Sequence, residues 1–338
     1  MQTQLKEKKK RPIWKKIAFG LISFILAITI LGASFEAIAG YQVVKNNPPE
    51  GKLVDVGGFK LHLHKQGKGG PTIILETGSG ASSTSWLDIP EELSKFGTVV
   101  TYDRGGYGWS EKADAERTGE NIVRELYKAL KKEKIEGPYI LVGHSLGGMY
   151  ARLFAQTYQD EVGGVVLLDA RTEDYSKETD PILLDAGVDP ILMGSSTKNV
   201  MALLKNLGII RLMGDSILKE IPKELREVAL NVEFRPKYFA AKEDELRNMT
   251  QLEDSIRNKS LEDIPLKVVT HGIPIDGTVI GISEADSNKM EDIWQEQQKQ
   301  MLTLSTNSEL IVAENSGHAV MHDEPDLVIE TVKSMINR

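Results

Sequence analysis

The stretch "YILVGHSLGGMY", residues 139–150, decides the fold, because an apolar run ends in it and a helix begins in it. The first part is typical of a buried strand, and "LGGMYARLFAQTY" continues from Leu146 with helical spacing. Ser145 stands at the turn between them, in the pattern Gly-His-Ser-Leu-Gly. A turn this tight strains its central residue and needs small neighbours, so that the backbone can fold back past itself. We therefore predict that the Ser145 hydroxyl is held above a sheet at a helix N-terminus, where developing negative charge is favoured, and acts as a nucleophile.

Strand-like and helix-like segments alternate on both sides of this stretch. Apolar runs that end in glycine or polar residues lie at 71–78, 97–108, 162–170, 265–272 and 308–318. Near-continuous apolar strands separated by helices are typical of a parallel sheet that is covered on both faces. The sequence therefore predicts an α/β fold with a mostly parallel sheet.

The alternation stops between Ala170 and Asp263, where amphipathic helical stretches follow one another without a strand. We expect a helical cap or lid over residues 171–262, which leaves the sheet and returns to it. The sheet-containing core would then consist of residues 53–170 and 263–338.

The N-terminal region combines a basic tail with a charge-free apolar run. Residues 1–16 carry seven Lys or Arg and one Glu, and residues 17–35 carry no charge. At about 1.5 Å per residue, a helix of that length just crosses a hydrocarbon core of roughly 30 Å. We predict a cytoplasmic tail at 1–16, a transmembrane anchor at 17–39 and a linker at 40–52, with the rest of the chain extracytoplasmic. The small-x-small pattern ending at Ala39 leaves an alternative open, in which the segment is a signal peptide cleaved near Ala39 and the mature chain is secreted.

Composition excludes several classes of function. The chain carries a net charge of −8, and without the tail's +6 the remainder carries about −14, which argues against a nucleic-acid partner. It contains no cysteine, so disulfides, thiolate catalysis and Cys-ligated metals are excluded.

A serine hydroxyl is a poor nucleophile until a base takes its proton, and the chain offers six histidines for that role. His318 lies in the predicted loop between the last strand and the C-terminal helix, which a parallel sheet brings to the same edge as Ser145. We predict that His318 is the base. His62 and His64 share one strand without a neighbouring carboxylate, and we interpret them as ordinary strand residues rather than metal ligands.

Three motifs carry a resemblance to a known family: Gly143–Gly147, "YDRGGYGWS" at 102–110 and "SGHAV" at 316–320. Together they resemble the α/β-hydrolase superfamily, over residues 53–338. The resemblance implies an eight-stranded, mostly parallel sheet, a triad in the chain order serine, acid, histidine, and a lid between strands six and seven. These motifs are specific to the superfamily and not to a substrate.

The acid of the triad has two leading candidates. A carboxylate must hold the imidazole tautomer and stabilise the imidazolium that forms during attack. Asp169 ends the strand after the nucleophile's strand, and Asp276 follows the next one, where most family members carry the acid. Asp276 lies further from Gly272 than the family's usual arrangement places it. We favour Asp169, with Asp276 as the alternative acid and with Asp286 and Glu284 as more distant choices.

An acyl-transfer transition state also needs hydrogen-bond donors for its oxyanion. The Leu146 N–H, which follows the nucleophile, is one predicted donor. The family takes the second from the loop after an early strand, usually written His-Gly-x, and here Thr77 stands in place of that histidine. Because the donor is a backbone amide, we predict the Ser79 N–H, against the alternative of a simple glycine turn.

These residues predict a serine hydrolase that cleaves an ester or related acyl substrate through an acyl-enzyme, without a metal or organic cofactor. Peptidase, thioesterase, acyltransferase and perhydrolase chemistry use the same triad and stay open, as does a non-catalytic ligand-binding homologue. The expected partners are a small apolar or amphipathic acyl substrate and a membrane contacted through the N-terminal helix.

Overall fold

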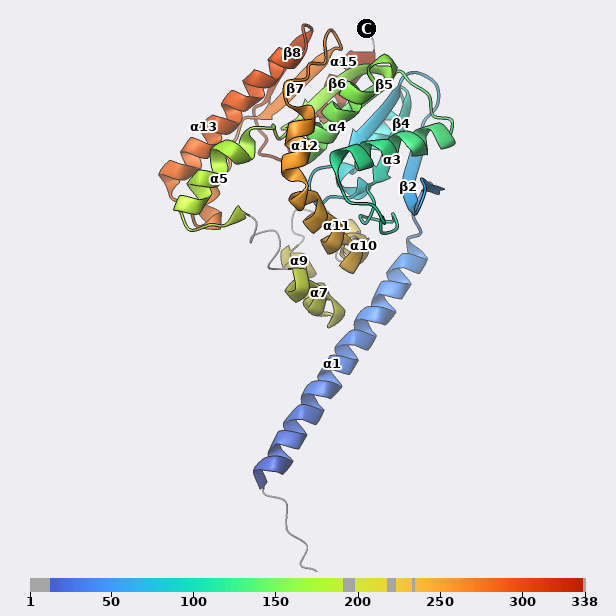
Figure 1. The fold of residues 1–338 in the computed structure, drawn as a ribbon. Coiled ribbons are helices and arrows are strands. Elements are labelled where there is room, and N and C mark those ends of the chain that lie inside the picture. Colours follow the sequence, from blue (N-terminus) through green and yellow to red (C-terminus); the bar gives the residue numbers. More distant parts are fainter. Residues whose placement is uncertain (1–12, 191–197, 218–222, 233–234, 337–338) are drawn as a thin grey trace, which may run out of the picture.

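The computed structural model describes residues 13–190, 198–217, 223–232 and 235–336, and its centre is an eight-stranded sheet (Figure 1). The strand order is β1-β2-β4-β3-β5-β6-β7-β8. The strands are β1 (Lys52–Asp55), β2 (Lys60–Gln66), β3 (Thr72–Glu76), β4 (Thr98–Asp103), β5 (Tyr139–His144), β6 (Val162–Leu168), β7 (Leu266–His271) and β8 (Ser308–Ala313). β2 runs antiparallel to β1 and β4, and the remaining pairs are parallel. The predicted eight-stranded, mostly parallel sheet is confirmed.

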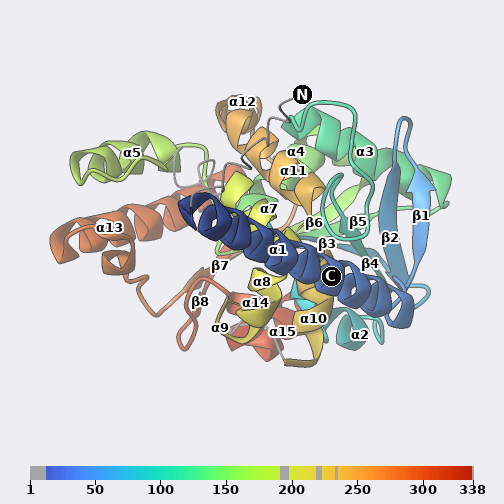
Figure 2. The same cartoon turned by 90° about the horizontal axis from the view of Figure 1, so that it is seen from below.

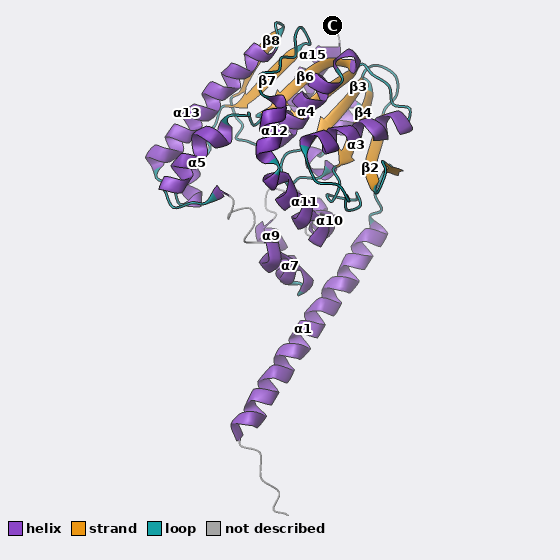
Figure 3. Cartoon of the chain, in the orientation of Figure 1, coloured by secondary structure: helices purple, strands orange, loops and turns teal. Residues whose placement is uncertain are grey.

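Helices cover both faces of the sheet, as Figure 3 shows by colour. One face packs against α3 (Gly119–Lys132), α4 (Leu146–Thr157) and α12 (Met249–Ile256), and the other against α2 (Ile89–Leu93), α14 (Val320–Asp323) and α15 (Pro325–Ile336). The central strands β3, β4, β5 and β7 are buried at every position because helices cover both faces, and their side chains alternate between the two cores. Ile74 and Leu141 enter the first core, whereas Leu75 and Val142 enter the second.

The chain leaves the sheet after β6 and returns to it at β7. The helices described in between are α5 (Tyr175–Asp185), α7 (Lys198–Asn206), α8 (Ile209–Leu212), α9 (Gly214–Ile217), α10 (Lys223–Val232), α11 (Pro236–Arg247) and α12. We refer to α7–α11 as the cap. After β7 follow a short 3₁₀ helix, η3 (Gly277–Ile280), and the long α13 (Glu284–Gln300). The predicted domain boundaries at 171 and 262 stay predictions.

A single long helix, α1 (Ile13–Asn46), precedes the sheet and projects from it (Figure 1). It is long and apolar enough to cross a membrane, and its most apolar window is not buried inside the protein. Because α1 continues to Asn46, the first part of the predicted linker at 40–52 is helical instead. Residues 1–12, which form most of the predicted basic tail, lie outside the described residues.

A buried guanidinium connects the sheet to the cap. Arg104 follows β4, and its side chain is 1% exposed. Its Nη1 lies 2.6 Å from Glu76 Oε1 at the end of β3, and its Nε lies 3.0 Å from Glu245 Oε1 on α11. It also donates to the carbonyl oxygens of Thr77 and Gly78, both at 2.8 Å. One side chain therefore holds the loop after β3 and the cap helix above it in a common position.

The substitution Arg104→Met removes a cation from between two buried carboxylates. Leaving Glu76 and Glu245 buried without their partner lowers the free energy of unfolding by about 3–5 kcal/mol. The matched control is Arg247→Met, which breaks an exposed pair with Glu243 on α11 and costs less than about 1 kcal/mol. Urea unfolding of the full chain in detergent, followed by tryptophan fluorescence, measures both. Equal losses for the two variants would contradict this role of Arg104.

Candidate active site

The turn between β5 and α4 holds Ser145 in a backbone conformation that non-glycine residues rarely adopt. Its φ and ψ are 53° and −123°. The Ser145 N–H donates to the Leu168 carbonyl at 3.1 Å, and the Ser145 carbonyl accepts from Gly148 N–H at 3.0 Å. A Cβ at Gly147 would lie 2.5 Å from the carbonyl oxygens of both Glu76 and Thr77, so only glycine fits there. The strained turn is thus held in place by its neighbours on β6 and β3.

The structure brings His318 to Asp169. His318 lies in the loop between β8 and α14, and its Nδ1 is 2.6 Å from Asp169 Oδ2. Asp169 directly follows β6 and is fully buried, and its Oδ1 accepts from Trp294 Nε1 at 2.9 Å. Burial alone raises the pKa of Asp169, but hydrogen bonds from His271 and then His318 outweigh it, so this pKa lies well below its usual range. Asp169 is therefore an ionised carboxylate that receives an N–H from His318.

Asp276, the alternative acid, lies elsewhere. It is exposed and begins η3, where it accepts from the Thr278 N–H at 2.9 Å and the Thr278 hydroxyl at 2.6 Å. These bonds hold the pKa of Asp276 below its ordinary value. Asp276 thus caps a short helix, as side chains of this type commonly do.

His144 connects the His318 loop to the turn that carries Ser145. The two imidazole centroids are 4.8 Å apart, and His144 Nε2 lies 2.8 Å from the His318 carbonyl oxygen. Burial, and next the neighbouring His318, lowers the pKa of His144 to about 3, so this ring is neutral and donates from Nε2. Within the described part of the chain, no hydrogen bond joins the Ser145 hydroxyl to the His318 ring. Catalytic hydrogen bonds often tighten only when substrate binds.

The two predicted oxyanion donors come from α4 and from the loop after β3. Leu146 is buried as the first residue of α4, and Ser79 is an exposed residue of the loop after β3. That loop passes close to Ser145, because a Cβ at Gly78 would lie 3.3 Å from Ser145 Cβ. The Gly78 carbonyl accepts a hydrogen bond from Arg104 at 2.8 Å. In a trans peptide the C=O and the N–H point in opposite directions, and the N–H of this peptide belongs to Ser79. The Ser79 N–H is therefore directed away from Arg104.

A second imidazole, which was not predicted from the sequence, contacts Asp169. His271 ends β7 and is buried, with Nδ1 2.8 Å from Asp169 Oδ2 and Nε2 2.8 Å from Glu291 Oε1 on α13. Burial lowers its pKa, but the bonds to Asp169 and Glu291 prevail and raise the pKa of His271 to about 9. His271 is therefore a cation at neutral pH. The sequence could have indicated this contact, because His271 ends the predicted strand that follows the one before Asp169. Neighbouring parallel strands end at the same edge of a sheet, so the two side chains were expected to lie close together.

His62, one of the two histidines on β2, is held by neighbouring groups of the protein. His62 Nδ1 lies 2.9 Å from Asp103 Oδ2 and its Nε2 lies 2.6 Å from the Glu50 carbonyl oxygen, so both of its nitrogens are occupied. Among the described residues, no group of three or more His, Asp or Glu side chains is arranged to hold a metal ion.

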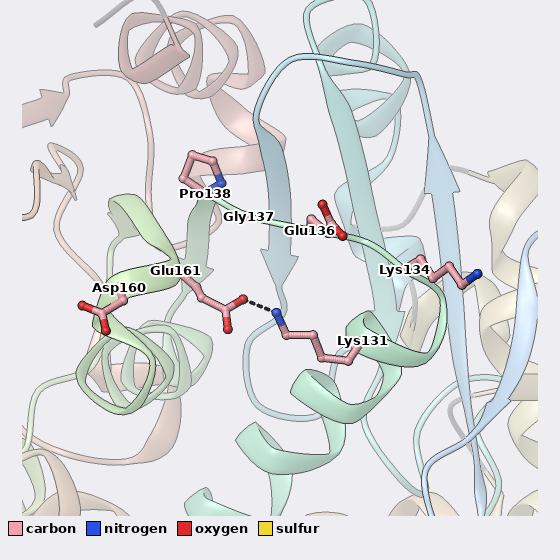
Figure 4. Close-up of a pocket in the computed structure, with 7 residues that line it drawn as sticks. All are labelled: Lys131, Lys134, Glu136, Gly137, Pro138, Asp160 and Glu161. Atoms are coloured by element: carbon pink, nitrogen blue, oxygen red, sulfur yellow. Dashed lines mark hydrogen bonds and ion pairs between the residues drawn. The ribbon is translucent and has the colours of Figure 1, made fainter.

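A pocket of about 460 Å³ lies far from these residues (Figure 4). It is lined by Lys131, Lys134, Glu136, Gly137, Pro138, Asp160 and Glu161. These residues precede β5 and β6, whereas Ser145 and Asp169 follow them. The pocket therefore lies at the edge of the sheet opposite Ser145.

Comparison with known proteins supports the family and the fold. The model of the "Alpha/beta hydrolase family" matches residues 73–331. The uncharacterized protein YqjL of Bacillus subtilis is 27% identical over 82% of this chain and 88% of its own length. The fold is similar to a thermophilic esterase from Thermogutta terrifontis (TM-score 0.57, 19% identity, 82% of this chain and 93% of that one). It is also similar to the Cif epoxide hydrolase from Acinetobacter nosocomialis (TM-score 0.66, 16% identity, 90% of this chain and 96% of that one).

The raised pKa of His271 predicts a specific dependence of stability on pH. A histidine whose pKa rises on folding contributes stability that is fully present below pH 6.5 and is lost as the pH rises through about 9. Between these pH values the melting temperature of the unmodified chain should fall relative to that of His271→Gln. In the control His64→Gln, burial lowers the histidine's pKa, so no difference in slope arises above pH 6.5. Parallel melting curves for the unmodified chain and His271→Gln would show that His271 is not a cation in the folded state.

Proposed function

This chain belongs to the alpha/beta hydrolase family, and we propose that it is a serine hydrolase that cleaves an ester or related acyl substrate. The nucleophile is Ser145, the base is His318 and the acid is Asp169. The observation that carries the proposal is the 2.6 Å bond between His318 Nδ1 and Asp169, a fully buried carboxylate.

The reaction proceeds in two acyl-transfer steps. The Ser145 Oγ attacks the acyl carbon while His318 Nε2 takes the hydroxyl proton, and the carbonyl electron pair moves onto oxygen. The Ser79 and Leu146 amides donate to this oxyanion. His318 then gives its proton to the leaving group, and an acyl-enzyme remains. A water molecule attacks the acyl-enzyme in the same way and releases the acid.

The serine at position 145 favours acyl-enzyme chemistry over the other reactions that proteins of this fold catalyse. One structurally similar protein is an esterase and another is an epoxide hydrolase, and at 19% and 16% identity they indicate the fold alone. A serine nucleophile forms an acyl-enzyme, whereas opening an epoxide through an alkyl-enzyme needs a carboxylate at that position. Peptidase, thioesterase, acyltransferase and perhydrolase activities share the acyl-enzyme and are distinguished by the acceptor and the bond cleaved.

We also propose that α1 is an uncleaved membrane anchor, with the N-terminus in the cytoplasm and the catalytic domain outside. Supporting this are the apolar length of α1 and the basic residues that precede it. The competing proposal is cleavage near Ala39 and secretion.

A reactive fluorophosphonate probe tests the triad. Ser145→Ala and His318→Ala should abolish labelling, and Asp169→Asn should slow it on the order of 10³–10⁴-fold, because the imidazole loses the partner that holds its tautomer. The matched control Asp276→Asn removes an exposed carboxylate and should label at the unmodified rate. Melting temperatures confirm that each variant is folded. Equal labelling of the unmodified chain and Ser145→Ala would favour a non-catalytic ligand-binding protein, and loss in Asp276→Asn alone would reassign the acid.

Membrane fractionation with N-terminal sequencing tests the anchor. The full chain should sediment with membranes, resist extraction by carbonate and retain the residues that precede Ala39. A soluble chain that begins near Gly40 would instead identify α1 as a cleaved signal peptide.

A further inference from the structure

An ionic cluster fastens the cap to α1. Within α1, all of which the structure describes, Glu36 is the one buried residue. It forms ion pairs with Lys205 on α7 and with Arg211 on α8, where the Arg211 Nε lies 2.8 Å from Glu36 Oε2. The side chains of Lys205 and Arg211 are themselves 7% and 6% exposed. A helix that served only as a tether would not need a buried carboxylate paired with two cations of the cap.

Two glycines let the cap lie directly against α1. A Cβ at Gly32 would lie 2.5 Å from the Leu207 carbonyl oxygen, and one at Gly40 would lie 2.9 Å from Asn231 Oδ1. Gly32, Glu36 and Gly40 are spaced four residues apart and therefore share one face of the helix. Figure 2 shows α7 and α8 beside α1 when the molecule is viewed from the α1 side. The cap thus packs along this face of α1, from Gly32 to Gly40.

This contact reaches into the apolar run. The charge-free segment ends at Phe35, so Gly32 lies about 4–5 Å inside its end at 1.5 Å per residue. Leu207 of the cap therefore lies level with the C-terminal end of the apolar part of α1. If α1 crosses a membrane, this level is the boundary between lipid headgroups and acyl chains.

The cap exposes large apolar side chains next to this contact. Val200 and Leu203 on α7 are 56% and 58% exposed, Leu212 on α8 is 79% exposed, and Met213 is 50% exposed. We call these four residues the cap patch. A soluble protein rarely leaves such a group uncovered without a partner for it.

We propose that the cap patch is inserted into the surface of the same bilayer that α1 crosses, and that the site takes its substrate, an amphipathic lipid ester, from that bilayer. The second part rests on the proposed hydrolase function. Cap helix α11, which packs against α7, lies over the loop that carries the predicted oxyanion donor. There, the Tyr238 hydroxyl lies 2.8 Å from the position of a Cβ at Gly80. The cap therefore extends from the membrane surface to the entrance of the catalytic turn.

The absence of cysteine makes the membrane contact directly measurable. Leu212→Cys in the full chain is labelled with an environment-sensitive fluorophore (NBD) and reconstituted in phosphatidylcholine nanodiscs, with or without nitroxide-labelled lipid. The control is Phe96→Cys, an exposed residue just before β4 and hence at the sheet edge opposite Ser145. We expect blue-shifted emission and quenching by nitroxide lipid at position 212 and neither at position 96. An emission maximum typical of water at position 212 would overturn the proposal. So would a blue shift that appears only when a second copy of the chain is present, because protein and not lipid would then cover the fluorophore.

The substrate class needs a second measurement. Leu203→Asp with Leu212→Asp should lower hydrolysis of a phospholipid ester in vesicles about tenfold or more, since two exposed leucines no longer enter the acyl region. Hydrolysis of the water-soluble p-nitrophenyl butyrate should not change, and Phe96→Asp should affect neither substrate. Equal losses on both substrates would contradict the membrane route. If the unmodified chain hydrolyses neither ester, the proposed function fails, while the fluorescence result still decides whether the patch contacts lipid.

Discussion

The Asp169 carboxylate is the group around which the candidate site is assembled. A fully buried charge is costly unless hydrogen bonds and opposite charges compensate for it. Here three elements far apart in the chain supply that compensation: the loop after β8 through His318, the end of β7 through His271, and α13 through Trp294. Each partner of Asp169 is therefore also a constraint on the relative position of its own element.

Buried charges recur at the other junctions of the molecule. Arg104 joins the loop after β3 to cap helix α11 through Glu76 and Glu245, and Glu36 joins α1 to the cap. Buried ion pairs of this kind contribute little net stability compared with apolar packing, because desolvation offsets their attraction. They do penalise every arrangement in which one partner is left alone. We infer that these pairs set how α1, the cap and the sheet are positioned, while the two apolar cores supply most of the stability.

The second imidazole changes the electrostatics expected of the candidate triad. His318 and His271 both donate to Asp169 Oδ2, and Glu291 balances the charge on His271. A carboxylate shared between two imidazoles stays ionised over a wide pH range, so it remains an acceptor for the His318 N–H. His271 holds this carboxylate in place. It does so from the end of β7, the strand next to β6, which Asp169 follows.

Some features were decided by the sequence alone, because they depend on neighbours along the chain. Apolar runs fully buried in a sheet have a recognisable pattern, and the glycines around Ser145 follow from how closely that turn must approach β3. These local rules predicted the parallel sheet, the strained serine and the edge at which His318 lies. No local rule distinguished Asp169 from Asp276, because each follows a strand that ends at the same edge of the sheet as the His318 loop. Only the tertiary structure placed one beside His318 and left the other capping η3. The pairing of His271 with Glu291, and of Glu36 with two cap cations, likewise depends on contacts between residues far apart in the chain, which no pattern of neighbours encodes.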